Sequence, residues 1–275
     1  MIGGLLVTIL GSAPIRPRTV NVTPSLQLTV FELASPGELV QQHWLGRTGV
    51  RSDPFGTVLW PGAVFASQRL CERPERVAGR DVLCLGTGTG LEALTAAALG
   101  ARRVIACDLN QLTLSLLSDA AKAADLDGVL ETRVLDLMSP EPLPYAHVHI
   151  YSDVLYTEEL ARAIARRCRH LLLDEPGGEM AESDATAEDA SKIVNTQPRW
   201  LLLTDSQGFH SKAFLETLND DDASQSVGLN ERQETEIFEW EQARLESFTG
   251  SGILTDEDVS YSTTVRCLDQ LVEGR

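Results

Sequence analysis

The sequence predicts an α/β protein in which helices cover both faces of a mostly parallel sheet. The first observation is a series of short, continuously apolar runs, such as 81–85 and 104–107, typical of strands buried on both faces. The second is that these runs alternate with Leu- and Ala-rich helical segments across short turns, as in parallel sheets. The third is a glycine-rich turn, 86–90, between the first such strand and its helix.

The remaining elements follow in chain order. Residues 20–34 alternate between apolar and polar side chains around Thr23-Pro24-Ser25, which predicts a small N-terminal β-hairpin. The parallel unit is then expected as strands 81–85, 104–107, 130–135, 147–151 and 200–204, with helices 91–99, 111–124, 157–170 (N-cap Thr157) and one through Phe214 and Leu218. The tail has two β-rich stretches, 232–238 and 260–268, which fit an antiparallel hairpin at the C-terminal edge of the sheet.

The composition favours one large domain. The chain has 275 residues, 43% of them hydrophobic, which is enough for one substantial core. We expect an N-terminal extension and β-hairpin over residues 1–55 and a single main domain over 56–275. Within it, residues 174–198 hold seven acidic residues among Gly and Ala, which predicts an acidic surface loop.

The formal net charge of −17 limits the partners of the protein. A strongly acidic surface repels phosphate backbones, so nucleic acid is not expected. The same charge either attracts a basic protein substrate or serves solubility alone, and both interpretations stay open. No stretch approaches the roughly 18–20 apolar residues of a membrane span, so no membrane partner is expected. We expect a monomer.

Five scattered cysteines, with no Cys-x-x-Cys pair, predict a reducing compartment and no zinc site. The five histidines show no metal-ligand spacing either, so no metal site is expected. The predicted location is the cytoplasm, with the nucleus as the alternative. Residues 1–13 are apolar and rich in small side chains, but no Lys or Arg precedes them. They are interpreted as a plain N-terminal extension, with an organelle-targeting segment as the alternative.

The chemistry is predicted at the glycine turn and at the ends of the next two strands. The turn consists of Gly86, Thr87, Gly88, Thr89 and Gly90. Its glycines let the backbone approach a ligand, with free N–H groups facing it. The third glycine comes one residue too early for the dinucleotide pattern, which suits a ligand without pyrophosphate. Asp108 ends the next strand, where a carboxylate can accept both ribose hydroxyls of an adenosine. Asp136 ends the third strand, where the adenine would lie.

This order of motifs resembles the seven-strand S-adenosylmethionine-dependent methyltransferases. Trp60-Pro61-Gly62-Ala63 and Asp153-Val154-Leu155-Tyr156 narrow the resemblance to the eukaryotic methyltransferase-like non-SET protein lysine methyltransferases, which carry an Asp-x-x-Tyr motif. The resemblance runs from about Val20 to Leu218. It implies a Rossmann-like, seven-stranded, mostly parallel sheet with an antiparallel C-terminal edge, and S-adenosyl-L-methionine as the cofactor of domain 56–275.

The resemblance also implies which residues bind the cofactor. By position they are Trp60, Gly86, Thr87, Gly88, the Leu137 site and Ser152. Gly90, Asp108 and Asp136 complete the predicted cofactor site. Leu137 departs from the family, many members of which carry Trp there against the adenine. Losing that ring removes about 0.5–1.5 kcal/mol of stacking.

Asp153 and Tyr156 are the predicted catalytic residues. A carboxylate at a strand end can accept a hydrogen bond from the substrate amine, and the Tyr ring can cover its cationic group. The structural alternative is that Asp153 caps, and Tyr156 packs on, the following helix. The expected acceptor is a protein lysine, with histidine second. A small-molecule methyltransferase and a non-catalytic S-adenosylmethionine-binding module remain alternatives.

Overall fold

The computed structural model describes residues 14–45, 54–173, 198–220, 237–251 and 257–272. The segment 1–13 lies outside these ranges, and so does the predicted acidic loop apart from Pro198.

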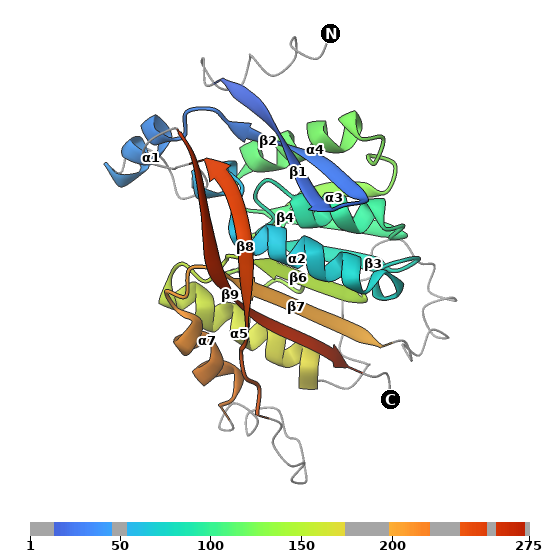
Figure 1. The fold of residues 1–275 in the computed structure, drawn as a ribbon. Coiled ribbons are helices and arrows are strands. Elements are labelled where there is room, and N and C mark those ends of the chain that lie inside the picture. Colours follow the sequence, from blue (N-terminus) through green and yellow to red (C-terminus); the bar gives the residue numbers. More distant parts are fainter. Residues whose placement is uncertain (1–13, 46–53, 174–197, 221–236, 252–256, 273–275) are drawn as a thin grey trace.

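Seven strands form one sheet in the order β5-β4-β3-β6-β7-β9-β8 (Figure 1). Strands β5, β4, β3, β6 and β7 pair in parallel, whereas β9 is antiparallel to β7 and to β8. This arrangement confirms the predicted fold class. The strands are β3 (Asp81–Leu85), β4 (Arg103–Asp108), β5 (Leu130–Val134), β6 (Val148–Ser152), β7 (Arg199–Asp205), β8 (Glu241–Ser251) and β9 (Asp258–Val272).

Helices cover both faces of this sheet. Along β3, Val82 and Cys84 point into one hydrophobic cluster while Leu83 and Leu85 point into the other, because successive side chains of a strand face opposite sides. The first cluster is closed by α2 (Pro61–Glu72), α3 (Leu91–Ala98) and α4 (Gln111–Ala123), and the second by α5 (Glu158–Leu173) and α7 (Ser211–Leu218). The predicted N-cap of α5 is confirmed, since Thr157 Oγ1 accepts a hydrogen bond from the Leu160 N–H at 3.2 Å.

The tail differs from the prediction in one strand. The strand expected at 232–238 is wrong: β8 begins at Glu241, Phe238 precedes it outside any strand, and 232–236 lie outside the described residues. The expected strand 260–268 is part of the longer β9. The helices α1 (Gly37–Trp44) and α2 were not predicted.

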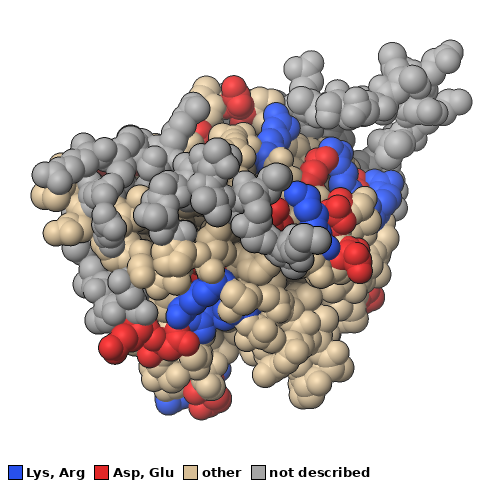
Figure 2. All heavy atoms as spheres, turned by 90° about the horizontal axis from the view of Figure 1, so that it is seen from above, with Lys and Arg blue, Asp and Glu red and all other residues tan. Residues whose placement is uncertain are grey.

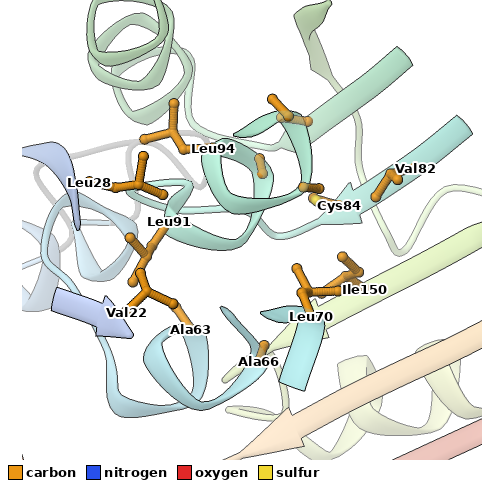
Figure 3. Close-up of a cluster of buried hydrophobic side chains, with 14 of the residues drawn as sticks. Val22, Leu28, Ala63, Ala66, Leu70, Val82, Cys84, Leu91, Leu94 and Ile150 are labelled. Atoms are coloured by element: carbon orange, nitrogen blue, oxygen red, sulfur yellow. The ribbon is translucent and has the colours of Figure 1, made fainter. Parts of the chain in front are cut away.

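The N-terminal hairpin, β1 (Ile15–Thr23) and β2 (Leu26–Leu33), is confirmed as an antiparallel pair. Its apolar face packs on the main domain. Figure 3 shows Val22 and Leu28 of the hairpin beside Leu91 of α3, and all three belong to the same buried cluster. The hairpin therefore shares its core with the helices on one face of the sheet.

A fully buried carboxylate, Glu32, fastens this hairpin to the rest of the chain. Its Oε2 accepts hydrogen bonds from Arg18 Nε at 2.6 Å and from the Ser251 hydroxyl of β8 at 3.0 Å. Its Oε1 accepts the Leu59 N–H at 2.8 Å, one residue before Trp60. Glu32 thus joins the N-terminal hairpin, the C-terminal hairpin and the segment that enters α2.

We predict that Glu32→Gln lowers the free energy of unfolding by about 2–4 kcal/mol. This range lies between the typical cost of losing one charged hydrogen bond and the typical cost of breaking a buried ion pair. Urea unfolding followed by circular dichroism measures this. The matched control is Glu131→Gln, whose ion pair with Arg103 is 43–50% exposed and should contribute less than about 1 kcal/mol. Equal losses in the two variants would show that the buried junction adds no stability.

Candidate active site

The predicted site residues meet where the strand order reverses direction. The chain runs from β3 outward through β4 and β5, and then returns to the other side of β3 with β6 and β7. In open parallel sheets, ligands bind at the carboxyl ends of the strands beside such a reversal. The glycine turn follows β3. Ser152 is the last residue of β6, and Asp153 comes directly after it. The structure therefore brings the two motifs, far apart in sequence, to one edge of the sheet.

The glycine turn is shaped by close contacts. Gly86 has φ +67°, in the left-handed region, which side chains rarely adopt. A Cβ at this position would lie 2.4 Å from Cγ1 of Val154, which follows β6. Only glycine fits here, and the turn lies directly against the Asp-x-x-Tyr segment.

The N–H groups of the turn are largely used within the protein, contrary to the expectation that they are free. Thr87 N–H donates to the Cys107 carbonyl at 3.0 Å, and Gly90 N–H donates to the Thr87 carbonyl at 2.7 Å. Gly88 N–H donates to Asp108 Oδ2 at 2.9 Å. The turn therefore offers a ligand close approach rather than a set of free donors.

Asp108 lies at the end of β4 beside this turn, as predicted. Besides the bond from Gly88, its Oδ1 accepts the Asn110 N–H at 2.8 Å. A carboxylate at this position is the kind of acceptor that ribose hydroxyls require. The role of Asp108 in binding a ribose remains a prediction.

Asp136 and Leu137 follow β5 at the same edge. Asp136 is exposed, and its Oδ1 accepts the Met138 N–H at 2.8 Å, so it stabilises a turn. Leu137 is partly buried, and its Cδ1 lies 4.0 Å from where a Cβ of Gly86 would be. The Arg167 guanidinium of α5 fixes this segment by donating to the Leu137 carbonyl at 3.1 Å and to two further carbonyls that follow. Leu137 is thereby held against the glycine turn.

Trp60 is brought to the site by the short segment before α2. Its Nε1 donates to the Phe55 carbonyl at 2.8 Å. In this segment the Gly56 carbonyl lies over the glycine turn, 3.2 Å from where a Cβ of Gly88 would be. The structure thus places residues 55–60 across the turn, and contact of Trp60 with a cofactor remains a prediction.

Asp153 connects three elements at the acceptor side of the site. Its backbone has φ +55°. Its Oδ2 accepts the Gly62 N–H of α2 at 2.6 Å, and its Oδ1 accepts the Ser206 N–H after β7 at 2.6 Å. A Cβ on Gly62 would lie 2.5 Å from Oδ2, which explains the glycine of Trp60-Pro61-Gly62-Ala63. Desolvation raises the pKa of Asp153 to about 6, although the two backbone N–H groups act in the opposite direction.

Two tyrosines lie at this end of the site. Tyr156 is 48% exposed, three residues after Asp153. Tyr261 of β9, which the sequence analysis missed, has a pKa raised by burial and by the charge of Asp153. The pairing of β9 with β7 and β8 brings Tyr261 here, and no local sequence signal indicates it. Direct participation of Asp153 and Tyr156 in catalysis remains a prediction.

Three buried polar atoms around the glycine turn have no hydrogen-bond partner among the described residues. They are Thr87 Oγ1, Ser152 Oγ and Glu92 Oε2. A buried polar group without a partner costs about 1–3 kcal/mol, so each one needs an explanation, such as a bound water, an ion or a ligand. Hydroxyl and carboxyl groups of this kind fit the hydroxyl, amino and carboxylate groups of S-adenosylmethionine.

Glu92 is a site residue that the sequence analysis missed. It is the second residue of α3 and is only 1% exposed. Burial, with a smaller effect from the nearby charges of Asp153 and Asp108, raises its pKa to about 8. The Thr87 hydroxyl lies near enough to favour the ionised form, although the two groups do not meet the geometry of a hydrogen bond. The available signal was a charged residue within the otherwise uncharged run of residues 91–98.

Other features of the described residues offer no competing site. Their His, Cys, Asp and Glu side chains form no group suited to hold a metal ion. None of their helices has the length and apolarity needed to cross a bilayer. An open hollow of about 520 Å³ lies at the opposite edge of the sheet, where Arg102 pairs with Asp81 and Arg103 pairs with Glu131. Both of its arginines are thus already paired with carboxylates of the same hollow.

Comparison with known proteins assigns this site to a family. The model of a family described as lysine methyltransferase matches residues 45–189, which is more than half of the chain. The chain belongs to this family. The assignment confirms the predicted class of enzyme, a methyltransferase of the lysine methyltransferase type, and the matched range includes the glycine turn, Asp108 and the Asp-x-x-Tyr segment.

Individual relatives are similar over parts of their length. The chain is 24% identical to the human electron transfer flavoprotein beta subunit lysine methyltransferase over 63% of this chain and 67% of the relative. It is 39% identical to a protein N-terminal and lysine N-methyltransferase from Neurospora crassa, over 26% of this chain and 24% of the relative. Among solved structures, a T. thermophilus 16S rRNA methyltransferase matches 96% of this chain and 52% of its own, with 13% identity and a TM-score of 0.47.

The buried Glu92 predicts a pH-dependent stability of the protein without ligand. Its pKa rises from 4.5 to about 8 on folding, so between these values the folded state binds a proton that the unfolded state has lost. The contribution of Glu92 to the free energy of unfolding should therefore fall as the pH rises through this range, by at most about 1.4 kcal/mol per pH unit. Urea unfolding at several pH values should show that Glu92→Gln flattens this decline, whereas Glu131→Gln retains it. Equal slopes in wild type and Glu92→Gln would contradict the prediction.

Proposed function

We propose that this chain binds S-adenosylmethionine at the glycine turn and transfers its methyl group to a lysine side chain of a protein. The observation that carries the proposal is the position of the turn at the reversal of strand order, with unpartnered buried atoms of Thr87, Ser152 and Glu92 around it. Membership of the lysine methyltransferase family supports both the reaction and the acceptor.

Each side chain of the site has a task in this reaction. The bound cofactor supplies an electrophilic methyl group on a sulfonium. Asp108 accepts the ribose hydroxyls, and Trp60 and Leu137 provide apolar surface near the nucleoside. On the other side, Asp153 and Tyr156 orient the acceptor amine and exclude water from it. Holding the nitrogen about 3–3.5 Å from the methyl carbon accounts for much of the rate in such a displacement.

The acceptor side suits a cationic side chain. Tyr156 and Tyr261 are 48% and 43% exposed, and aromatic faces attract ammonium groups. The net charge of −17 favours a basic protein substrate over nucleic acid. Figure 2 shows acidic and basic side chains interspersed on the face seen from above, not a continuous basic surface. A monomeric state and a cytoplasmic location remain proposals that rest on the sequence.

One assay separates this function from its alternatives. The protein is incubated with radiolabelled cofactor and a lysate of the source cells. Label on a protein band, recovered as methyl-lysine after hydrolysis, supports the proposal, and methyl-histidine would redirect it to the second acceptor. Label in acid-soluble metabolites would indicate a small-molecule methyltransferase. Bound label without any methylated product would indicate a binding module.

We predict that Asp108→Ala weakens S-adenosylmethionine binding at least ~10-fold, because a charged acceptor of two ribose hydroxyls is lost and each such bond contributes roughly 1.5–3 kcal/mol. Calorimetric titration measures the affinity. Asp119→Ala is the control, since Asp119 pairs with Lys122 on α4. Unchanged affinity in Asp108→Ala would exclude the assigned cofactor site.

We also predict that Tyr156→Phe lowers single-turnover methyl transfer by up to ~100-fold, as for a positioned polar catalyst. Its half-exposed ring is retained, so the melting temperature and the cofactor affinity should stay nearly unchanged. Tyr145→Phe is the control, because Tyr145 precedes the start of β6 whereas Tyr156 follows its end. Asp153→Asn is less selective, because it also disturbs the bonds to Gly62 and Ser206. Full activity of Tyr156→Phe would leave Tyr156 with a packing role only.

A further inference from the structure

Glu92 is a carboxyl group placed where an apolar residue would pack without penalty. It is 1% exposed in the first turn of α3, directly after the glycine turn, and its helical neighbours Leu91 and Ala93 are fully buried. Its Oε2 has no hydrogen-bond partner among the described residues, although the Thr87 hydroxyl lies nearby. Burying such an acceptor unpaired is unfavourable unless a ligand completes it.

Glu92 lies close to both ends of the site. Asp108, on the ribose side, and Asp153, on the acceptor side, are both close enough to raise its pKa. Cys84 of β3 also lies near Glu92. The pKa of its thiol is raised by burial and by the charge of Glu92. The groups that face Glu92 are thus acidic or neutral. A donor that carries positive charge would satisfy both the unpartnered oxygen and the local excess of negative charge.

We propose that Glu92 Oε2 accepts a hydrogen bond from the α-ammonium group of the methionine part of the bound cofactor. This inference rests on the proposed function and assigns one further residue of the same site. Within the methionine part of the cofactor the ammonium has three N–H donors, whereas the sulfonium and the carboxylate have none, so the ammonium is the only group of that part that can donate to the oxygen. With the ribose at Asp108 and the methyl group directed toward Asp153, the methionine part of the cofactor would lie near Glu92, which is close to both carboxylates.

Three adenosine ligands test the proposal by calorimetric titration of wild type and Glu92→Gln. S-Adenosylmethionine has both the sulfonium and the ammonium, S-adenosylhomocysteine has the ammonium alone, and 5′-methylthioadenosine has neither. Glu92→Gln should weaken the first two at least ~10-fold and 5′-methylthioadenosine less than ~3-fold, because only the amino-acid part loses its partner. Glu131→Gln, on the opposite edge of the sheet, should bind all three like wild type.

Other patterns of binding overturn the proposal. Unchanged affinity for S-adenosylhomocysteine in Glu92→Gln excludes the ammonium contact, even if S-adenosylmethionine is weakened. An equal loss with all three ligands shows that Glu92 only shapes the glycine turn. A wild-type protein that binds none of the three refutes the proposed function itself, and with it this inference.

A measurement on wild-type protein covers the case in which Glu92→Gln does not fold. With a pKa of about 8, the side chain is mostly protonated at pH 7 in the free protein, and the ammonium should draw it into the ionised form. Titrations in buffers of different ionisation enthalpy should therefore show release of most of a proton with S-adenosylhomocysteine, and almost none with 5′-methylthioadenosine. The same proton balance for both ligands would contradict the contact.

Discussion

The carboxylate of Asp153 is the interaction on which the acceptor side of the site depends. It binds the Gly62 N–H at the start of α2 and the Ser206 N–H after β7, each at 2.6 Å, from a position just beyond β6. The first N–H groups of a helix have no partner within it, and the helix dipole favours a negative charge there. One side chain thereby fixes the start of a helix against the ends of two neighbouring strands. The Thr204 hydroxyl of β7 reinforces this junction by donating to the Gly62 carbonyl.

Glu32 makes a similar junction between the hairpins at the two ends of the described chain. It connects Arg18, Ser251 and the Leu59 N–H, so the segment that crosses the glycine turn is held by both hairpins. Buried or partly buried carboxylates therefore join elements that are distant in sequence, through partners that carry N–H or guanidinium groups. At the glycine turn the pattern is incomplete: Glu92 has the same chemistry, but one of its oxygens lacks a donor. This difference separates Glu32, whose carboxylate holds the fold, from Glu92, for which we propose a ligand contact.

Elements with local signals were predictable from the sequence. The buried parallel strands are continuous apolar runs, and the glycine turn has a spacing that few other structures require, so β3 to β7 were predicted to within a few residues. Strand β8 was misplaced because only a few of its side chains, such as Leu245 and Phe248, are buried, so its pattern is weak and its position depends on pairing with β9. The partners of Asp153 could not be inferred, since Gly62 lies 91 residues away. Glu32 and Glu92 look like surface charges in the sequence, and only packing shows that they are buried.

The electrostatics of the site explain how ligand binding and folding are coupled. Asp108, Glu92 and Asp153 lie around one turn, and the mutual repulsion of their charges adds to burial in raising the pKa of Glu92 to about 8. Without ligand, the fold accommodates this cluster by keeping Glu92 protonated at neutral pH. Under the proposed contact, the ammonium group of the cofactor would let Glu92 ionise and would supply the missing donor at the same time. Part of the binding free energy is therefore spent on moving that proton, and the rest stabilises the folded state by mass action. The proposed contact would favour adenosine derivatives that carry an ammonium group, because one without it leaves Glu92 protonated and unpartnered.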